Sequence, residues 1–113
     1  MQILTEPKTI DELRIIAKNI FENLVKAVVD VRRGMIAIDA EMHADLEAYL
    51  IESGSTQSDL WGINLLPFES DNSFLEFDSM INIRPSQNNR SRTVEDTALQ
   101  ERIAEIVSRW ILK

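Results

Sequence analysis

The stretch from Arg84 to Arg92 concentrates side chains that can bind an anion. It contains three arginines and no acidic residue, in a chain whose net charge is −7. Arginine and amide donors that converge on one place can hold a phosphate or a carboxylate with paired hydrogen bonds. We therefore expect an anionic small molecule to bind to this stretch and the adjacent strands, through Asn64, Asn82, Arg84, Gln87, Asn89, Arg90 and Arg92. The competing interpretation is a solvated loop whose arginines pair with acids of neighbouring elements, as exposed arginines commonly do.

The only histidine, His43, has an acidic residue two positions away on each side, Glu41 and Asp45. An imidazole beside a carboxylate can act as a general base, because its ordinary pKa lies close to neutrality. His43 is therefore a candidate catalytic residue with Glu41 or Asp45 as its partner, although a surface histidine bonded to a carboxylate would show the same spacing. One histidine gives no metal-binding motif and the glycines form no phosphate loop, so we predict neither a metal nor a cofactor.

Four predicted strands position these residues. Gly34 in the turn allows a hairpin, and alternation of apolar and polar residues favours strands over 25–32, 35–39, 60–66 and 75–84. One side of these strands is mainly apolar, and the other carries polar residues: Lys26, Asp30, Asn64, Asp78, Asn82 and Arg84. That second side also holds an apolar set, which predicts a homodimer interface or a ligand cleft: Val28, Leu60, Leu66, Phe74 and Met80.

Three helices complete the predicted domain. Thr9 and Glu12 form a capping box that begins a helix reaching about Asn23, and residues 93–96 likewise cap a last helix. The middle helix, 39–53, either starts at residue 39 or follows a strand that runs on to His43. A short edge strand is expected at 2–4. The predicted fold is one α+β domain over residues 1–113, a two-layer sandwich with a mainly antiparallel four-stranded sheet and helices on one face, in the order αββαββα.

Composition excludes several classes of protein. The chain has no cysteine, which excludes disulfides and thiolate metal sites, and it has no apolar run long enough to span a bilayer. The amino terminus lacks the pattern of a signal peptide, so we expect a cytoplasmic location with no membrane partner. An acidic chain without a basic stripe or surface aromatic residues is a poor candidate for nucleic-acid binding.

Four segments together resemble a known family. They are Ala-Val-Val-Asp at 27–30, Met-His-Ala-Asp at 42–45, Leu-Trp-Gly-Ile-Asn at 60–64, and the long motif from Phe77 to Arg92. Together they are similar to a family of short single-domain prokaryotic proteins of unknown function. The resemblance implies a stand-alone domain and assigns no role to any residue. Two functional hypotheses therefore stand, namely binding of an anionic small molecule and a homodimeric or partner-interaction domain without catalytic activity.

Overall fold

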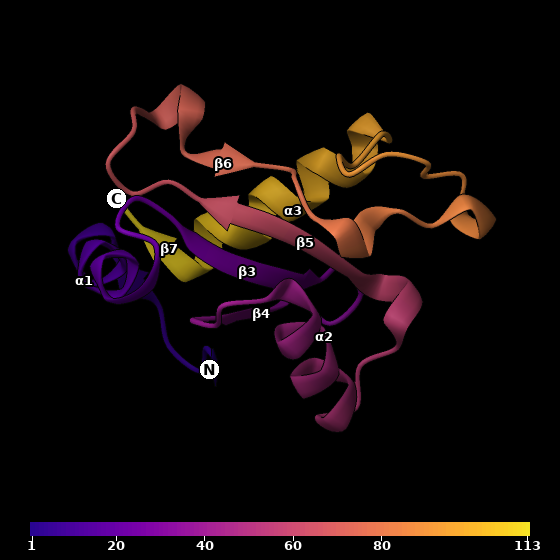
Figure 1. Cartoon of the computed structure of the whole chain (residues 1–113), viewed down its shortest axis with the longest axis horizontal. Helices are drawn as coiled ribbons and strands as arrows, with labels where there is room; N and C mark the ends of the chain where they lie inside the picture. Colours follow the sequence, from indigo (N-terminus) through magenta and orange to yellow (C-terminus); the bar gives the residue numbers. More distant parts are fainter.

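A five-stranded antiparallel sheet forms the centre of the protein, and three helices pack around it (Figure 1). The computed structural model describes residues 1–113. The strands lie in the order β1 (Gln2–Ile3), β4 (Met35–Ile38), β3 (Val25–Asp30), β5 (Leu60–Leu65) and β6 (Leu75–Glu76). A separate parallel pair joins β2 (Lys8–Thr9) to β7 (Ile111–Leu112). The sheet thus has one strand more than predicted, because the short segment at 2–3 pairs with β4.

The helices are α1 (Ile10–Ile20), α2 (His43–Glu52) and α3 (Thr97–Trp110). The predicted capping box of α1 is confirmed, since the Thr9 hydroxyl accepts from the Glu12 amide at 3.2 Å and the Glu12 carboxylate accepts from the Thr9 amide at 3.0 Å. α3 begins later than predicted, because Asp96 caps it by accepting from the amide two residues on at 2.9 Å. None of the three helices is long and apolar enough to cross a lipid bilayer.

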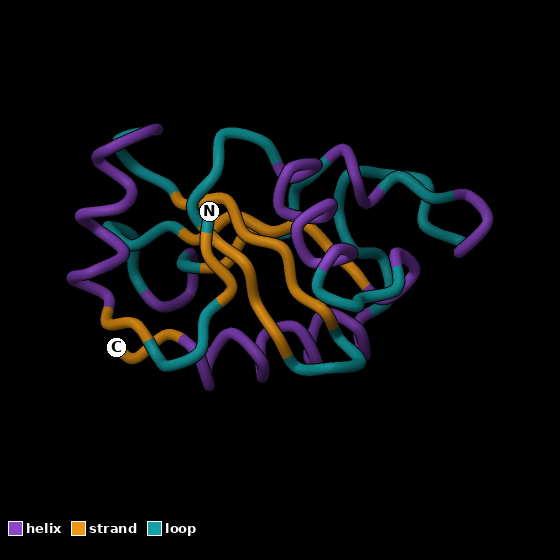
Figure 2. Tube along the Cα trace, turned by 90° about the horizontal axis from the view of Figure 1, so that it is seen from below, coloured by secondary structure: helices purple, strands orange, loops and turns teal.

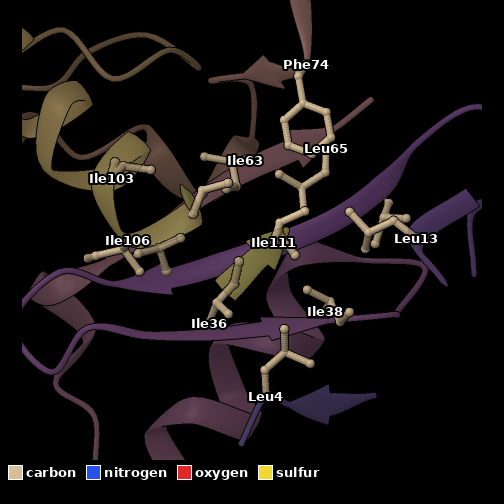
Figure 3. Close-up of a cluster of buried hydrophobic side chains, with 14 of the residues drawn as sticks. Leu4, Leu13, Ile36, Ile38, Ile63, Leu65, Phe74, Ile103, Ile106 and Ile111 are labelled. Carbon is tan, nitrogen blue, oxygen red and sulfur yellow. The ribbon is translucent and has the colours of Figure 1, made fainter. Parts of the chain in front are cut away.

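The main hydrophobic core lies on the side of the sheet covered by α1 and α3 (Figure 3). The alternate residues that the sequence predicts to point inward from β3 and β5 are all buried in this core: Val25, Ala27, Val29, Trp61, Ile63 and Leu65. Leu13 from α1 and Ile103 and Ile106 from α3 pack against them and are fully buried. The strand alternation and the amphipathic patterns of these two helices therefore specify this half of the fold.

The helices do not share one face of the sheet, contrary to the prediction. Leu46 and Leu50 of α2 pack in a second, separate cluster with Val28 and Leu60, which point away from the main core. Figure 2 shows the strands between α3 and α2. The apolar residues Val28 and Leu60, which motivated the predicted dimer interface, are thus buried inside the chain by α2.

The fourth predicted strand is much shorter than expected, because only Leu75–Glu76 pairs with β5. The chain then leaves the sheet and forms the 3-10 turn η3 (Met80–Asn82). The side chain of Asn82 replaces the missing strand, since its Oδ1 accepts from the Gly62 amide at 2.8 Å and its Nδ2 donates to the Gly62 carbonyl at 2.9 Å. A side-chain amide thus makes the hydrogen bonds with the β5 backbone that a neighbouring strand would otherwise make. The alternation of residue types in the sequence cannot show this replacement.

Candidate functional site

The guanidinium of Arg84 is half-buried and is held by acceptors of the chain itself. It stacks over the Trp61 ring, with its central carbon 4.4 Å from the ring centre, and burial lowers its pKa. It donates hydrogen bonds to four acceptors of the chain: the carbonyls of Gln57, Leu60 and Ile81 and the side-chain oxygen of Gln87. A planar group with several fixed donors suits this task, and these bonds leave it little capacity for a ligand. Arg84 therefore fixes the loop to the start of β5.

Asn89 organises the loop that follows. Its Nδ2 donates to the carbonyls of Asn82 and Thr93, both at 2.7 Å, and its Oδ1 accepts from the Glu95 amide at 2.9 Å. The Glu95 carboxylate in turn accepts from two successive loop amides at 2.9 Å each. The side chain of Asn89 is 3% exposed, so its polar atoms serve the loop and not a ligand. The segment from Asn82 to Glu95 is consequently a self-bonded structural unit.

A cleft of about 170 Å³ opens between the start of α2, the strands β3 and β5, and the segment around η3. Its polar lining residues come from five separate parts of the chain: Lys26, His43, Asn64, Asp78, Ser79 and Arg92. Met42 and Met80 border it and are 58% and 65% exposed. An apolar cavity of about 150 Å³ accommodates a molecule of the size of benzene, so this cleft admits a small metabolite or part of a larger one.

His43 lies at the first position of α2 and is 8% exposed. Its Nε2 lies 2.8 Å from the carbonyl oxygen of Ile63 in β5. Because a carbonyl only accepts hydrogen bonds, Nε2 must carry the proton, and in the neutral ring Nδ1 is then an acceptor. Burial lowers the pKa of His43, and a positive charge at Lys26 also lowers it, so the ring is neutral at physiological pH. His43 therefore presents a fixed tautomer with a free lone pair.

Asn64 contributes a second acceptor to the cleft. Its Nδ2 donates to the Glu76 carboxylate at 2.8 Å and to the Asp78 carbonyl at 3.3 Å. Both partners only accept, so they determine which end of the amide is nitrogen and which is oxygen. The Oδ1 atom is consequently directed away from them, is buried, and has no hydrogen-bond partner in the chain. An unpaired buried oxygen beside a cleft indicates a place where a ligand can donate a hydrogen bond.

The N-terminus of α2 opens into the same cleft. The preceding residue, Met42, has no side-chain oxygen and makes no capping bond. The amides of His43 and Ala44 have no acceptor within the chain, and both residues line the cleft. Unpaired amides and the positive end of the helix dipole favour a negative group at this position. Helix starts usually carry Ser, Thr, Asp or Asn, so the methionine marks an unusual terminus.

The charged residues of the cleft add to this positive field. Lys26 projects from β3, and its Nζ lies 5.0 Å from the centre of the Phe21 ring. The Nε of Arg92 donates to the Asp78 carboxylate at 2.6 Å, and this bond raises the pKa of Arg92. The Arg92 side chain is about half exposed, and its terminal nitrogens form no hydrogen bond within the chain. Two cations and one anion thus border a cleft on a chain whose net charge is −7.

The structure brings together three of the residues that the sequence selects, namely His43, Asn64 and Arg92. Glu41 and Asp45 are exposed, lie outside the cleft lining and make no hydrogen bond with His43. Four other residues predicted to bind the ligand use their side chains in hydrogen bonds that hold the loop or β5: Asn82, Arg84, Gln87 and Asn89. Arg90 is exposed, and its side chain has no hydrogen-bond partner in the chain.

Sequence reasoning did not select Lys26 or the first-turn amides of α2. Lys26 was placed among the polar residues on one side of the predicted strands without a binding role, and the amides could be located only once the start of α2 was known. The available signal was Met42, a residue without a capping group directly before a helix. A residue that cannot cap the helix leaves the amides of the first turn open to a ligand.

A larger cavity of about 450 Å³ lies beside the C-terminal half of α3. Its lining is mostly apolar and comes from η2 (Asp71–Ser73), the start of β6, α3 and the last three residues. The charged residues there, Lys113 and Asp71, pair with each other at 3.5 Å. No set of unpaired polar atoms converges on this cavity, so it has fewer groups that could bind a polar ligand than the cleft at α2.

Comparison with known proteins gives a family without an activity. No curated protein and no solved structure matches the chain. The model of DUF5674, described as a protein of unknown function, matches residues 2–110. This match agrees with the resemblance of the sequence to a family of unknown function. Because it covers nearly the whole chain, the protein belongs to the DUF5674 family.

Proposed function

We propose that this protein binds a small anionic molecule in the cleft at the N-terminus of α2. The observation that carries the proposal is the uncapped first turn, whose amides at His43 and Ala44 open into a cleft bordered by Lys26 and Arg92. Amide donors at a helix start and two cationic side chains together favour a carboxylate or a phosphate.

The arginine loop takes part in this proposal by positioning Arg92. The carbonyl of Arg92 accepts from the Ser79 amide and from the Asn82 Nδ2, both at 3.0 Å. These bonds fix the backbone from which the guanidinium reaches the cleft. Arg84 and Asn89 hold the rest of the loop and do not themselves touch the ligand.

The proposed affinity follows from the number of contacts. A hydrogen bond to a charged group contributes about 1.5–3 kcal/mol, and the helix terminus adds up to about 1 kcal/mol. Two or three such contacts in an open cleft give about 4–6 kcal/mol, which corresponds to dissociation constants from about 1 mM down to about 0.04 mM. A larger natural ligand that also contacts the exposed Met42 and Met80 would bind more tightly.

The test is a titration of the protein labelled with nitrogen-15 by inorganic phosphate and by acetate, followed by NMR. The proposal expects saturable shifts of the His43 and Ala44 amides, weakened several-fold in Lys26→Ala and in Arg92→Ala. Arg90→Ala is the matched control, because it removes the same charge from an exposed side chain without a partner. If the two amides do not shift with either anion, or if Arg90→Ala weakens binding as much as Arg92→Ala, the proposed site is wrong.

A second candidate function is association with another protein molecule, including a second copy of this chain. Met42 and Met80 support it, because they are exposed on both sides of the cleft, and flexible methionines suit adaptable contacts. Sedimentation at high micromolar concentration tests this proposal, with Met80→Lys as the disrupting variant and Met1→Lys, an exposed methionine at the terminus, as the control. A monomer at all concentrations would count against self-association.

A further inference from the structure

Two hydrogen-bond acceptors face the cleft beside its anion-binding groups. The first is Oδ1 of Asn64, which is buried and has no partner, in a side chain that is 6% exposed. The second is Nδ1 of His43, which has no partner because the ring proton lies on Nε2 against Ile63. The two side chains are neighbours, since His43 bonds to the carbonyl of Ile63, the residue directly before Asn64, and both line the cleft.

A pair of acceptors cannot satisfy each other. Each requires a donor, and a carboxylate or a fully ionised phosphate monoester offers only further acceptors. A ligand that placed a carboxylate or phosphate oxygen against Asn64 Oδ1 would set two negative atoms against each other in a partly buried site. The anionic group must therefore lie on the side of the α2 amides, and a different group of the ligand must meet the two acceptors.

Metal ions and ammonium groups fit this position poorly. An imidazole nitrogen and an amide oxygen can bind a metal, but no group of three His, Asp or Glu side chains is arranged to hold one. The nearest carboxylate of the lining, Asp78, is already paired with Arg92 at 2.6 Å. Lys26 and the positive end of α2 also repel a second cation. A neutral donor is what remains, and a hydroxyl group is the smallest one that fits beside a carboxylate in a cleft of about 170 Å³.

Resting on the proposed function, we infer that the cleft recognises a small carboxylate with a hydroxyl group on the adjacent carbon, a 2-hydroxy acid. The carboxylate lies against the amides of His43 and Ala44, while the hydroxyl donates to Asn64 Oδ1 or His43 Nδ1. An apolar substituent of the ligand can then rest on Met42 or Met80, which border the cleft. A molecule of about six heavy atoms fills the volume of about 170 Å³.

The experiment compares two ligands that differ only in the hydroxyl group, lactate and propionate, at pH 7.5. Binding is followed by NMR through the α2 amides and the ring of the single histidine. We expect lactate to bind about tenfold more tightly, a discount from the much larger ratios seen in closed sites, because water competes for the same acceptors here. Asn64→Ala should reduce this ratio at least threefold while propionate binding is retained, because only Nδ1 of His43 then remains to accept the hydroxyl proton.

A second variant keeps the test independent of the folding of Asn64→Ala. In His43→Gln the new amide nitrogen can still donate to the Ile63 carbonyl, but the Nδ1 acceptor is lost, so the lactate preference should fall at least threefold. If lactate and propionate bind wild type equally, the inference is overturned and the proposed anion site stands. If neither binds, the proposed function fails and the inference fails with it. If the preference survives in both variants, the hydroxyl is recognised elsewhere and the inference is wrong.

Discussion

Replacing Asn82 should destabilise the protein far more than a loop asparagine normally does. Asn82 is fully buried, and its side chain makes the only hydrogen bonds of the Gly62 backbone on the β6 side of β5. In Asn82→Ala the Gly62 amide and carbonyl lose their partners in a buried place, at about 1–3 kcal/mol each. The expected loss is about 4 kcal/mol, a large part of the 5–15 kcal/mol typical of a domain.

Urea unfolding followed by circular dichroism measures this loss. Asn82→Asp tests the cause, because it keeps the side-chain volume but places an oxygen opposite the Gly62 carbonyl, so we expect it to be at least as destabilising as Asn82→Ala. Asn72→Ala is the control, since Asn72 is exposed in η2 and its side chain has no hydrogen-bond partner, and it should change stability by less than about 0.5 kcal/mol. The reasoning is refuted if Asn82→Asp is as stable as wild type, or if Asn82→Ala behaves like Asn72→Ala.

Three further predictions concern single side chains. Gly62→Ala should lower the unfolding free energy measured in urea by several kcal/mol, because the new Cβ would lie 2.5 Å from Cβ of Ser79. Gly54→Ala is the comparison, because its Cβ would meet only an Arg33 side-chain nitrogen at 3.5 Å, so that it reports backbone strain without a steric clash. Arg84→Lys should lose about 2 kcal/mol, since an ammonium cannot reach four acceptors and stack on Trp61 together, whereas Arg90→Lys should be neutral in the same assay. Burial lowers the pKa of His43 below its ordinary value of 6.5, so the unfolded chain binds the proton more readily than the folded one. The stability that the neutral ring contributes is therefore complete above about pH 6.5 and is lost as the pH falls. The difference in unfolding free energy between wild type and His43→Gln should be flat above that pH and decrease below it.

Local patterns in the sequence predicted much of the fold. The Thr9–Glu12 capping box, the hairpin around Gly34 and the strand at 60–65 are all present. Each depends on neighbours in the chain or on alternation within one strand, which the sequence displays directly. The predicted strand over 75–84 was wrong beyond Glu76, because the Ser79 and Asn82 side chains bond to the backbone in place of a ladder.

The candidate site depends on contacts that no local pattern contains. Residue types in the sequence selected His43, Asn64 and Arg92, but gave no means of separating them from Arg84 and Asn89, whose donors are used within the loop.

The sequence by itself determined an α+β domain, two of its helix faces and the two faces of its central strands. Only the tertiary structure decided that α2 covers the second face of the sheet, and that its uncapped start meets Lys26, Asn64 and Arg92. The physical reason is that alternation specifies which side chains need covering but not which helix covers them. Likewise, the type of a polar residue shows that it needs a hydrogen-bond partner but not which group will be that partner. The partner is determined only when the chain packs.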